Sequence, residues 1–108
     1  MELLTFPAVA DALSVPVNRI DQYVRDGHLL AVRDKGGARC VPAEFVQDGA
    51  IVKSLHSVIT MLRDARFADA EIVEWMFRED DTLAGCPIEL LRANRGSEVK
   101  RFAKVAGY

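Results

Sequence analysis

The sequence lacks any long apolar run, so it offers no candidate for a membrane-spanning helix. No stretch approaches the ~18 consecutive apolar residues that a span requires. The first residues, Met1 to Pro7, also lack the basic and apolar regions of a secretory signal peptide. We therefore expect a soluble protein that works in the cytoplasm and has no membrane partner.

Cysteine and histidine are scarce, with two residues of each. Cys40 and Cys86 are far apart and form no C-x-x-C pair, and His28 and His56 do not complete the roughly four clustered ligands that zinc needs. We predict two reduced, mostly buried thiols. We predict neither a metal nor another cofactor.

The motifs that carry catalysis are also missing. The sequence contains no Walker loop, no G-x-S-x-G and no H-E-x-x-H. The densest carboxylates are Glu71, Glu74 and the run Glu79-Asp80-Asp81, which we interpret as a solvated helix end and loop. Because no acid, base and nucleophile are brought together, we predict that the protein is not an enzyme.

The chain has no surplus of positive charge, since its formal net charge is −2. This excludes a protein that coats nucleic acid through bulk charge. If the chain binds DNA, a local patch must supply the positive field.

The first part of the chain has the pattern of two helices joined by a tight turn. Thr5 is placed to cap a short helix, and Pro7 fits its first turn. Residues 14–16 break that helix, and a second helix is predicted over 17–26. It ends at Gly27, which suits the left-handed position after a helix. The short break is the spacing of a helix-turn-helix.

A hairpin is predicted next, because the apolar periodicity changes after Gly27. Residues 29–33 and 38–41 are predicted as strands, and residues 34–37 as the turn, which contains Gly36 and Gly37. Pro42 to Val46 is predicted as the start of a short helix. Residues 1–48 are therefore predicted to form a winged helix-turn-helix domain.

Residues 49–108 are predicted to form a second, helical domain. We expect a long helix from Val52 to about Arg66, a helix capped by Asp69, a loop over 80–86, a helix from Pro87 to about Arg95, and a last helix capped by Ser97. The predicted fold class is mainly α with a small two-stranded β-hairpin wing.

The helix over 17–26 has an apolar side and a polar side. The apolar side holds Val17, Ile20 and Val24. The opposite side holds Asn18, Gln22 and Arg25, with Arg19 beside them. Asn and Gln pair with adenine in the major groove and Arg pairs with guanine, so this stripe suits a recognition helix. The alternative interpretation is an ordinary exposed polar face.

Basic residues surround the tip of the predicted hairpin. They are Arg33, Lys35 and Arg39. A wing of this kind lays Lys and Arg against phosphates or into the minor groove. The alternative is a charged hairpin that only covers the core. His28, at the end of the recognition helix, is a further candidate for a phosphate contact or for a structural role.

The order of these motifs resembles the MerR and excisionase type of winged helix. The resemblance rests on residues 5–16, Thr-Phe-Pro-Ala-Val-Ala-Asp-Ala-Leu-Ser-Val-Pro, followed by Ile20, Tyr23, Arg25-Asp26-Gly27, Leu29-Leu30 and Gly37-Ala38-Arg39. It covers about residues 3–47. The chain has no room for the long coiled coil and effector domain of MerR proteins, so effector sensing is not implied.

The second half resembles two kinds of domain. Its motifs are Trp75-Met76-Phe77, Leu83 to Leu91, Gly96 to Arg101, and Ala103. They are similar to the C-terminal helical domain of a small actinobacterial (mycobacterial-type) DNA-binding protein family, and also to the toxin-binding domain of Xre/ParS-type antitoxins. Over the whole chain the first likeness is closer, and it implies a DNA-binding or transcriptional regulatory protein.

The partners expected are double-stranded DNA and either a second copy of the chain or another protein bound by the C-terminal domain. The alternative function is a protein-interaction or antitoxin-like module in which the winged helix is a scaffold. Five cations against one carboxylate between Arg92 and Lys104 indicate either ordinary helix-end charges or a second patch for phosphate or an acidic partner.

Overall fold

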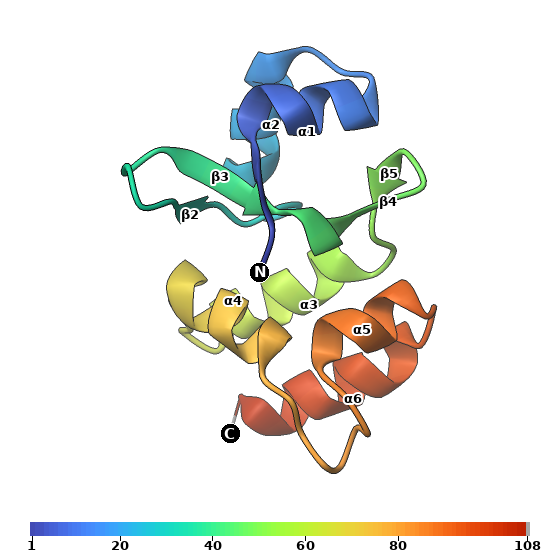
Figure 1. The fold of residues 1–108 in the computed structure, drawn as a ribbon. Helices are drawn as coiled ribbons and strands as arrows, with labels where there is room; N and C mark the ends of the chain where they lie inside the picture. Colours follow the sequence, from blue (N-terminus) through green and yellow to red (C-terminus); the bar gives the residue numbers. More distant parts are fainter. Residues whose placement is uncertain (108) are drawn as a thin grey trace. The chain divides into compact units, whose positions relative to one another are not determined.

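The computed structural model describes residues 1–107 of the chain. These residues form two units, the first from Met1 to Val52 and the second beginning at Lys53. Both are built mainly from helices, and the strands of the described residues all belong to the first unit (Figure 1). The predicted fold class, mainly α with a β-hairpin wing, is confirmed.

The first unit contains the predicted pair of helices. Helix α1 spans Phe6–Leu13, and the Thr5 hydroxyl accepts a hydrogen bond from the Ala8 N–H at 3.2 Å, as expected of a helix cap. The chain leaves α1 through Ser14 at φ 56°. Helix α2 spans Val17–Arg25 and begins directly after Pro16. The helix-turn-helix is therefore confirmed.

The end of α2 is also as predicted. Gly27 has φ +78°, a conformation that glycine adopts without steric cost. The His28 N–H then donates to the Tyr23 carbonyl at 2.8 Å, so the chain turns back along the helix before it enters the hairpin. This turn fixes the direction in which the wing leaves the helix.

The wing belongs to a sheet of three strands. Strand β2 is Val32–Arg33, β3 is Arg39–Pro42 and β1 is Leu3–Thr5, in the order β1-β3-β2, and all pairs are antiparallel. Strand β1 was not predicted, because three residues are too short to show an alternating pattern. The predicted strand over 29–33 was too long: Leu29 and Leu30 are fully buried, and the Leu29 N–H bonds back to Tyr23 at 3.3 Å.

A second hairpin follows where a helix and then a domain boundary were expected. Residues Ala43–Phe45 form only a 3₁₀ turn, η1, and then β4 (Val46–Gln47) pairs with β5 (Ala50–Ile51). The turn between them has positive φ at Asp48 (53°) and Gly49 (78°). Asp48-Gly49 is a strong hairpin signal, although no hairpin was predicted here. This hairpin extends the first unit to Val52.

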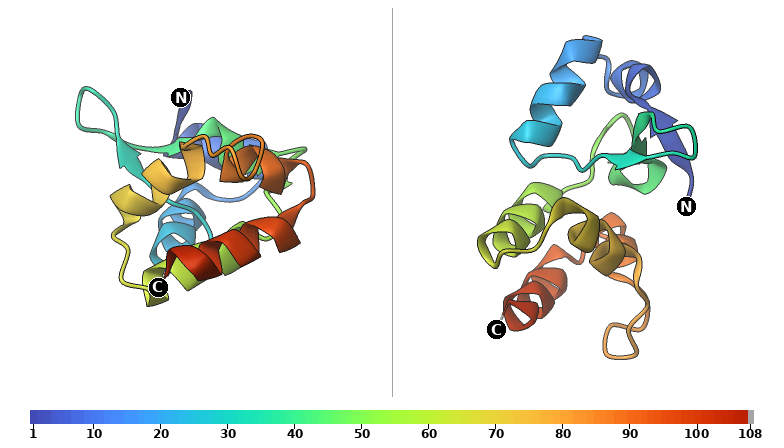
Figure 2. Two further views of the ribbon diagram at one scale, coloured as in Figure 1. Left: turned by 90° about the horizontal axis from the view of Figure 1, so that it is seen from below. Right: turned by 90° about the vertical axis from the view of Figure 1, so that its left-hand side faces the viewer.

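The second unit consists of four helices. They are α3 (Leu55–Asp64), α4 (Asp69–Phe77), α5 (Pro87–Arg92) and α6 (Gly96–Ala106). Helix α6 packs along α3 and against α5, while α4 contacts α3 and α5 (Figure 2). The Trp75 ring stacks on Phe102 with centroids 5.5 Å apart. The helical nature of this half is confirmed.

The ends of these helices differ from the predictions. Helix α3 begins at Leu55 and ends at Asp64, and α5 ends at Arg92, so both are shorter than predicted. Helix α4 begins at Asp69 itself, whose carboxylate accepts bonds from Arg63 at 2.9 and 3.0 Å instead of capping the helix. Helix α6 begins one residue before Ser97, because Gly96 is already helical.

Two smaller predictions concern the cysteines and the membrane. Cys40 and Cys86 are buried free thiols, as predicted. No helix in the described part of the chain is long and apolar enough to cross a membrane.

Candidate nucleic-acid interface

Helix α2 presents a polar face to solvent. Asn18, Gln22 and Arg25 are exposed on it, with Arg19 exposed beside them. On the opposite side Ile20 is fully buried and Val24 is 8% exposed. For these residues the predicted separation of α2 into a buried apolar side and an exposed polar side is therefore present.

Val17 departs from this division, because it was assigned to the buried side and is 48% exposed. It is the first residue of α2. Helical side chains lean toward the N-terminus, so the side chain of a first residue extends beyond the helix end, where no earlier turn covers it. An exposed apolar group at this end of α2 matches the apolar contacts that thymine methyl groups make in the major groove.

The wing tip is held in shape by Asp34. Its Oδ1 accepts hydrogen bonds from the N–H groups of Gly36 and Ala38, each at 2.9 Å. The Gly37 N–H donates to the Asp34 carbonyl at 3.0 Å, and Gly37 has φ +85°. These bonds hold the turn, and the hairpin stands out from the rest of its unit (Figures 1 and 2).

Two of the predicted wing cations are exposed near this tip. Lys35 lies in the turn itself. The Arg33 Nη1 donates to the Gly37 carbonyl at 2.7 Å, so its side chain lies along the hairpin. A guanidinium carries five N–H donors, and this single bond leaves others for a phosphate.

The third wing cation, Arg39, forms an ion pair with a residue of helix α2. Its Nη2 lies 2.8 Å from Asp21 Oδ1, and its guanidinium stands 4.9 Å from the centre of the Phe6 ring. Asp21 Oδ2 lies 3.4 Å from Arg25 Nη1. Asp21 thus joins α2 to β3 through Arg39, and it also pairs with Arg25 on its own helix. Both arginines were predicted to contact DNA.

The position of Asp21 between two of the candidate DNA-contacting arginines was not predicted from the sequence. Its spacing of four residues from Arg25 is the signal for an ion pair on one helix face. Its pairing with Arg39 links residues far apart in the chain, and no local pattern reveals it.

His28 lies at the end of α2, where its ring is half-buried. The ring packs edge-on against Tyr23 with centroids 5.8 Å apart. Both alternatives for His28, a phosphate contact and a structural role, stay predictions.

The cations of the first unit gather on these two elements. Residues 1–52 contain five Lys and Arg side chains, namely Arg19, Arg25, Arg33, Lys35 and Arg39. All five lie on α2 or on the β2–β3 hairpin. The same unit carries seven Asp and Glu residues, so its positive field is local, as the net charge requires.

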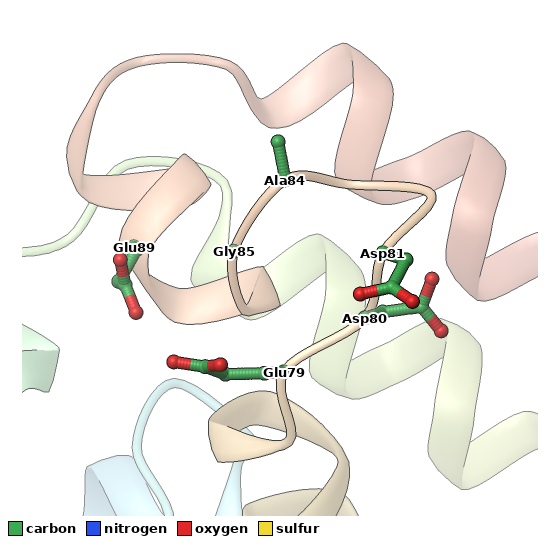
Figure 3. A pocket seen from close by; sticks show the side chains of 6 residues that line it. All are labelled: Glu79, Asp80, Asp81, Ala84, Gly85 and Glu89. Atoms are coloured by element: carbon green, nitrogen blue, oxygen red, sulfur yellow. The ribbon is translucent and has the colours of Figure 1, made fainter.

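A hollow in the second unit is lined by carboxylates. The lining residues are Glu79, Asp80, Asp81, Ala84, Gly85 and Glu89 (Figure 3). The side chains of Asp80 and Asp81 point to the other side of the loop from those of Glu79 and Glu89. Hydrogen bonds from the side chain and backbone of Thr82 lower the pKa of Asp80. No group of three ligating side chains in the described residues is placed to hold a metal ion.

The two units match two models of one protein family. The model described as "DNA-binding protein Rv2175c, wHTH domain" matches residues 1–46, and the model described as "Rv2175c C-terminal domain of unknown function" matches residues 52–107. The chain belongs to the Rv2175c family. Its resemblance to a small mycobacterial-type DNA-binding family is thereby confirmed.

A curated relative and a solved structure support the same assignment. The chain is 36% identical over 114 residues to DNA-binding protein Rv2175c of Mycobacterium tuberculosis (strain ATCC 25618 / H37Rv). The match covers 94% of this chain and 78% of the relative. The NMR structure of Rv2175c matches with a TM-score of 0.89 and 34% identity over 99% of this chain and 82% of that one. The Rv2175c-family fold therefore extends over both units.

Proposed function

We propose that this Rv2175c-family chain binds double-stranded DNA in the cytoplasm and regulates transcription. In this proposal α2 enters the major groove and the β2–β3 wing contacts the backbone or minor groove. The observation that carries it is the gathering of every Lys and Arg of an otherwise acidic unit on α2 and the wing. The same elements also carry Asp21, Asp26 and Asp34, so they hold five cations against three carboxylates.

The polar face of α2 has the chemistry of base recognition. Asn18 and Gln22 carry amides that pair bidentately with adenine, and Arg25 carries the fork that pairs with guanine. Arg19, at the edge of the face, suits a phosphate. Burial of Ile20 and Val24 fixes the rotation of the helix, so the polar face has one direction in which to meet DNA.

The wing contributes phosphate contacts at its tip and an ion pair to α2 at its base. Lys35 and Arg33, at the exposed tip, contact phosphates. Arg39 keeps the base of the wing on α2 through Asp21, so the two DNA-contacting elements hold a constant spacing. His28, at the end of α2, contacts a further phosphate in this proposal.

The test is a binding titration of the full chain against random and genomic duplexes at two salt concentrations. Because each bidentate base contact contributes about 1–3 kcal/mol to discrimination, we expect Gln22→Ala plus Arg25→Ala to weaken binding to preferred sites by at least tenfold. Binding to random duplexes should change much less. Unchanged selectivity would remove α2 from the proposal.

A matched control is available in the second unit. Thr60→Ala plus Arg78→Ala also removes one neutral polar and one cationic exposed side chain, and Arg78 is paired with Glu74 four residues away as Arg25 is with Asp21. We expect this variant to keep the selectivity of the unmodified chain. Equal losses of selectivity in both variants would indicate a general effect of charge and would contradict a specific role of α2.

We also expect two copies of the chain on a preferred site. One helix of nine residues contacts few base pairs, and specific sites are commonly read by two-fold dimers with half-sites about 34 Å apart. Analytical ultracentrifugation of the complex with a selected duplex should give two chains for each duplex. One chain for each duplex on a full-length preferred site would contradict this expectation.

A further inference from the structure

Helix α6 carries three cations on one side. At 100° for each residue, Lys100, Lys104 and Arg101 fall within a sector of about 100° of the helix surface. Arg101 and Lys104 are exposed and Lys100 is half-buried. Val99 and Ala103, 0% and 2% exposed, face the core. We call Lys100, Arg101 and Lys104 the α6 basic face.

Two carboxylates lie near this face: Glu98, whose pKa is lowered by its hydrogen bonds from Arg95 and also by the charge of Arg101, and Asp64 of α3, which lines the same hollow as Lys104. Glu98 is the one acidic residue of α6, and Arg95 holds it with two contacts of 3.1 and 2.6 Å. None of the three cations of the basic face forms an ion pair with another residue of the described part of the chain. Their charge is therefore available to a ligand.

Helix stability does not explain the arrangement. A cation near the C-terminus of a helix is favoured by the macrodipole, and Lys104 lies in the last turn. Lys100 lies before that turn, where the dipole no longer acts. Arg101 also lies before it, three residues after Glu98, at the spacing of a stabilising pair. Lys100 and Lys104 are four residues apart, a spacing at which like charges repel and weaken the helix. The Lys100–Lys104 pair therefore costs stability, which favours a binding role for these two lysines.

We propose that the α6 basic face is a second contact with the DNA phosphate backbone. This inference rests on the proposed function. Lys100 and Lys104 are about 6 Å apart along the helix axis, and successive phosphates of one strand rise by about 3.4 Å. Two flexible side chains on one helix face can thus reach two phosphates of one strand, and Arg101 lies beside them.

The surroundings of the face favour DNA over other partners. Protein interfaces have an apolar centre, and membrane-surface helices bury an apolar side in lipid. The core side of α6 is already covered, and Val105 is the large apolar side chain exposed on this helix. In the first unit Arg25 and Arg39 share Asp21, so part of its positive charge is already neutralised and a second contact adds substantially to binding.

The experiment compares the salt dependence of duplex binding for two variants of the full chain. The first is Lys100→Gln, Arg101→Gln and Lys104→Gln. The second, with the same change of charge, is Lys53→Gln, Arg66→Gln and Arg78→Gln, at exposed positions of the same unit. Each lost phosphate contact reduces the slope of log K against log salt by about 0.9.

We expect the first variant to reduce that slope by about 2 to 3 and the second to leave it close to that of the unmodified chain. Equal slopes in the unmodified chain and the first variant would overturn the α6 contact alone. No binding by the unmodified chain at low salt would instead overturn the proposed function.

A second measurement needs no substitution. Acylation of lysines in the unmodified chain, read by mass spectrometry with and without duplex, should show protection of Lys100 and Lys104. Lys53, exposed outside the proposed contact, is the internal reference. Protection no greater than that of Lys53 would overturn the α6 contact.

Discussion

At the scale of single residues, Asp21 is the carboxylate that contacts two of the cations proposed to face DNA. It pairs with Arg39 at 2.8 Å and with Arg25 at 3.4 Å, and its side chain is 39% exposed. Exposed ion pairs contribute about 0–1 kcal/mol to stability. Asp21 is therefore expected to affect DNA binding more than folding.

Replacing Asp21 by Asn should make the interface more positive and less selective. We expect tighter binding to random duplexes, a steeper salt dependence, and a smaller preference for a selected site, because Arg25 and Arg39 become available to phosphates. The free energy of unfolding should fall by less than about 1 kcal/mol. Duplex titrations and urea denaturation measure the two effects.

The control is Asp11→Asn, which removes the same charge from an exposed position on α1. If the two variants gain equally in affinity for random DNA, Asp21 has no special place in the interface.

The two thiols give a prediction about pH. Burial, and then the charge and hydrogen bond of Asp34, raise the pKa of Cys40, and burial followed by a hydrogen bond to Glu89 raises that of Cys86. The thiolate is the reactive form. In the folded chain, alkylation should therefore be slow at pH 8 and accelerate at a higher pH than in the urea-unfolded chain, whose thiols have a pKa of about 8.5. Identical pH profiles of the alkylation rate in the folded and unfolded chains would show that the folded environment does not raise the pKa of the thiols.

At the scale of elements, the start of α6 depends on a close approach to the residue before α3. A Cβ at Gly96 would meet Ser54 Oγ at 2.7 Å and Ser54 Cβ at 2.9 Å. Ser54 itself has φ 72°, so the backbone there has little freedom to retreat. Glycine is required at position 96 because of this contact, and the helix begins there in place of the predicted cap at Ser97.

Gly96→Ala should lower the free energy of unfolding by about 1–3 kcal/mol, the usual cost of overpacking. In a Ser54→Gly background the same substitution should cost much less, because the opposing side chain is gone and glycine accepts the positive φ. Urea denaturation of the four chains measures this coupling. Additive effects of the two substitutions would show that the contact is not the cause.

The elements that the sequence predicted well are those with local signals. Thr5 and Gly27 mark helix ends through their own chemistry. The spacing of four residues between the apolar Ile20 and Val24 sets the rotation of α2. Strand β1 and the tie between Asp21 and Arg39 depend on residues distant in sequence, so no local pattern contained them. The β4–β5 hairpin was missed although Asp48-Gly49 signals it.

At the scale of the whole molecule, the formal net charge of −2 hides an uneven distribution. In the first unit the cations lie on α2 and the wing, and in the second the α6 basic face contrasts with the carboxylates around Glu79 (Figure 3). Such separation lets an acidic protein bind DNA locally while the rest of its surface repels phosphate. Binding by a single chain should therefore weaken as salt is raised, with a shallow slope because few phosphates are contacted.

The most direct test of α2 as the reading element is an NMR titration of the isotope-labelled full chain with a short selected duplex. We predict that the largest changes in amide chemical shift fall in residues 17–25 and 33–39, with smaller changes on α6. A random duplex should reproduce the changes on the wing but not those at Asn18 and Gln22. Saturable binding that leaves the amides and side-chain amides of α2 unchanged would contradict the central claim.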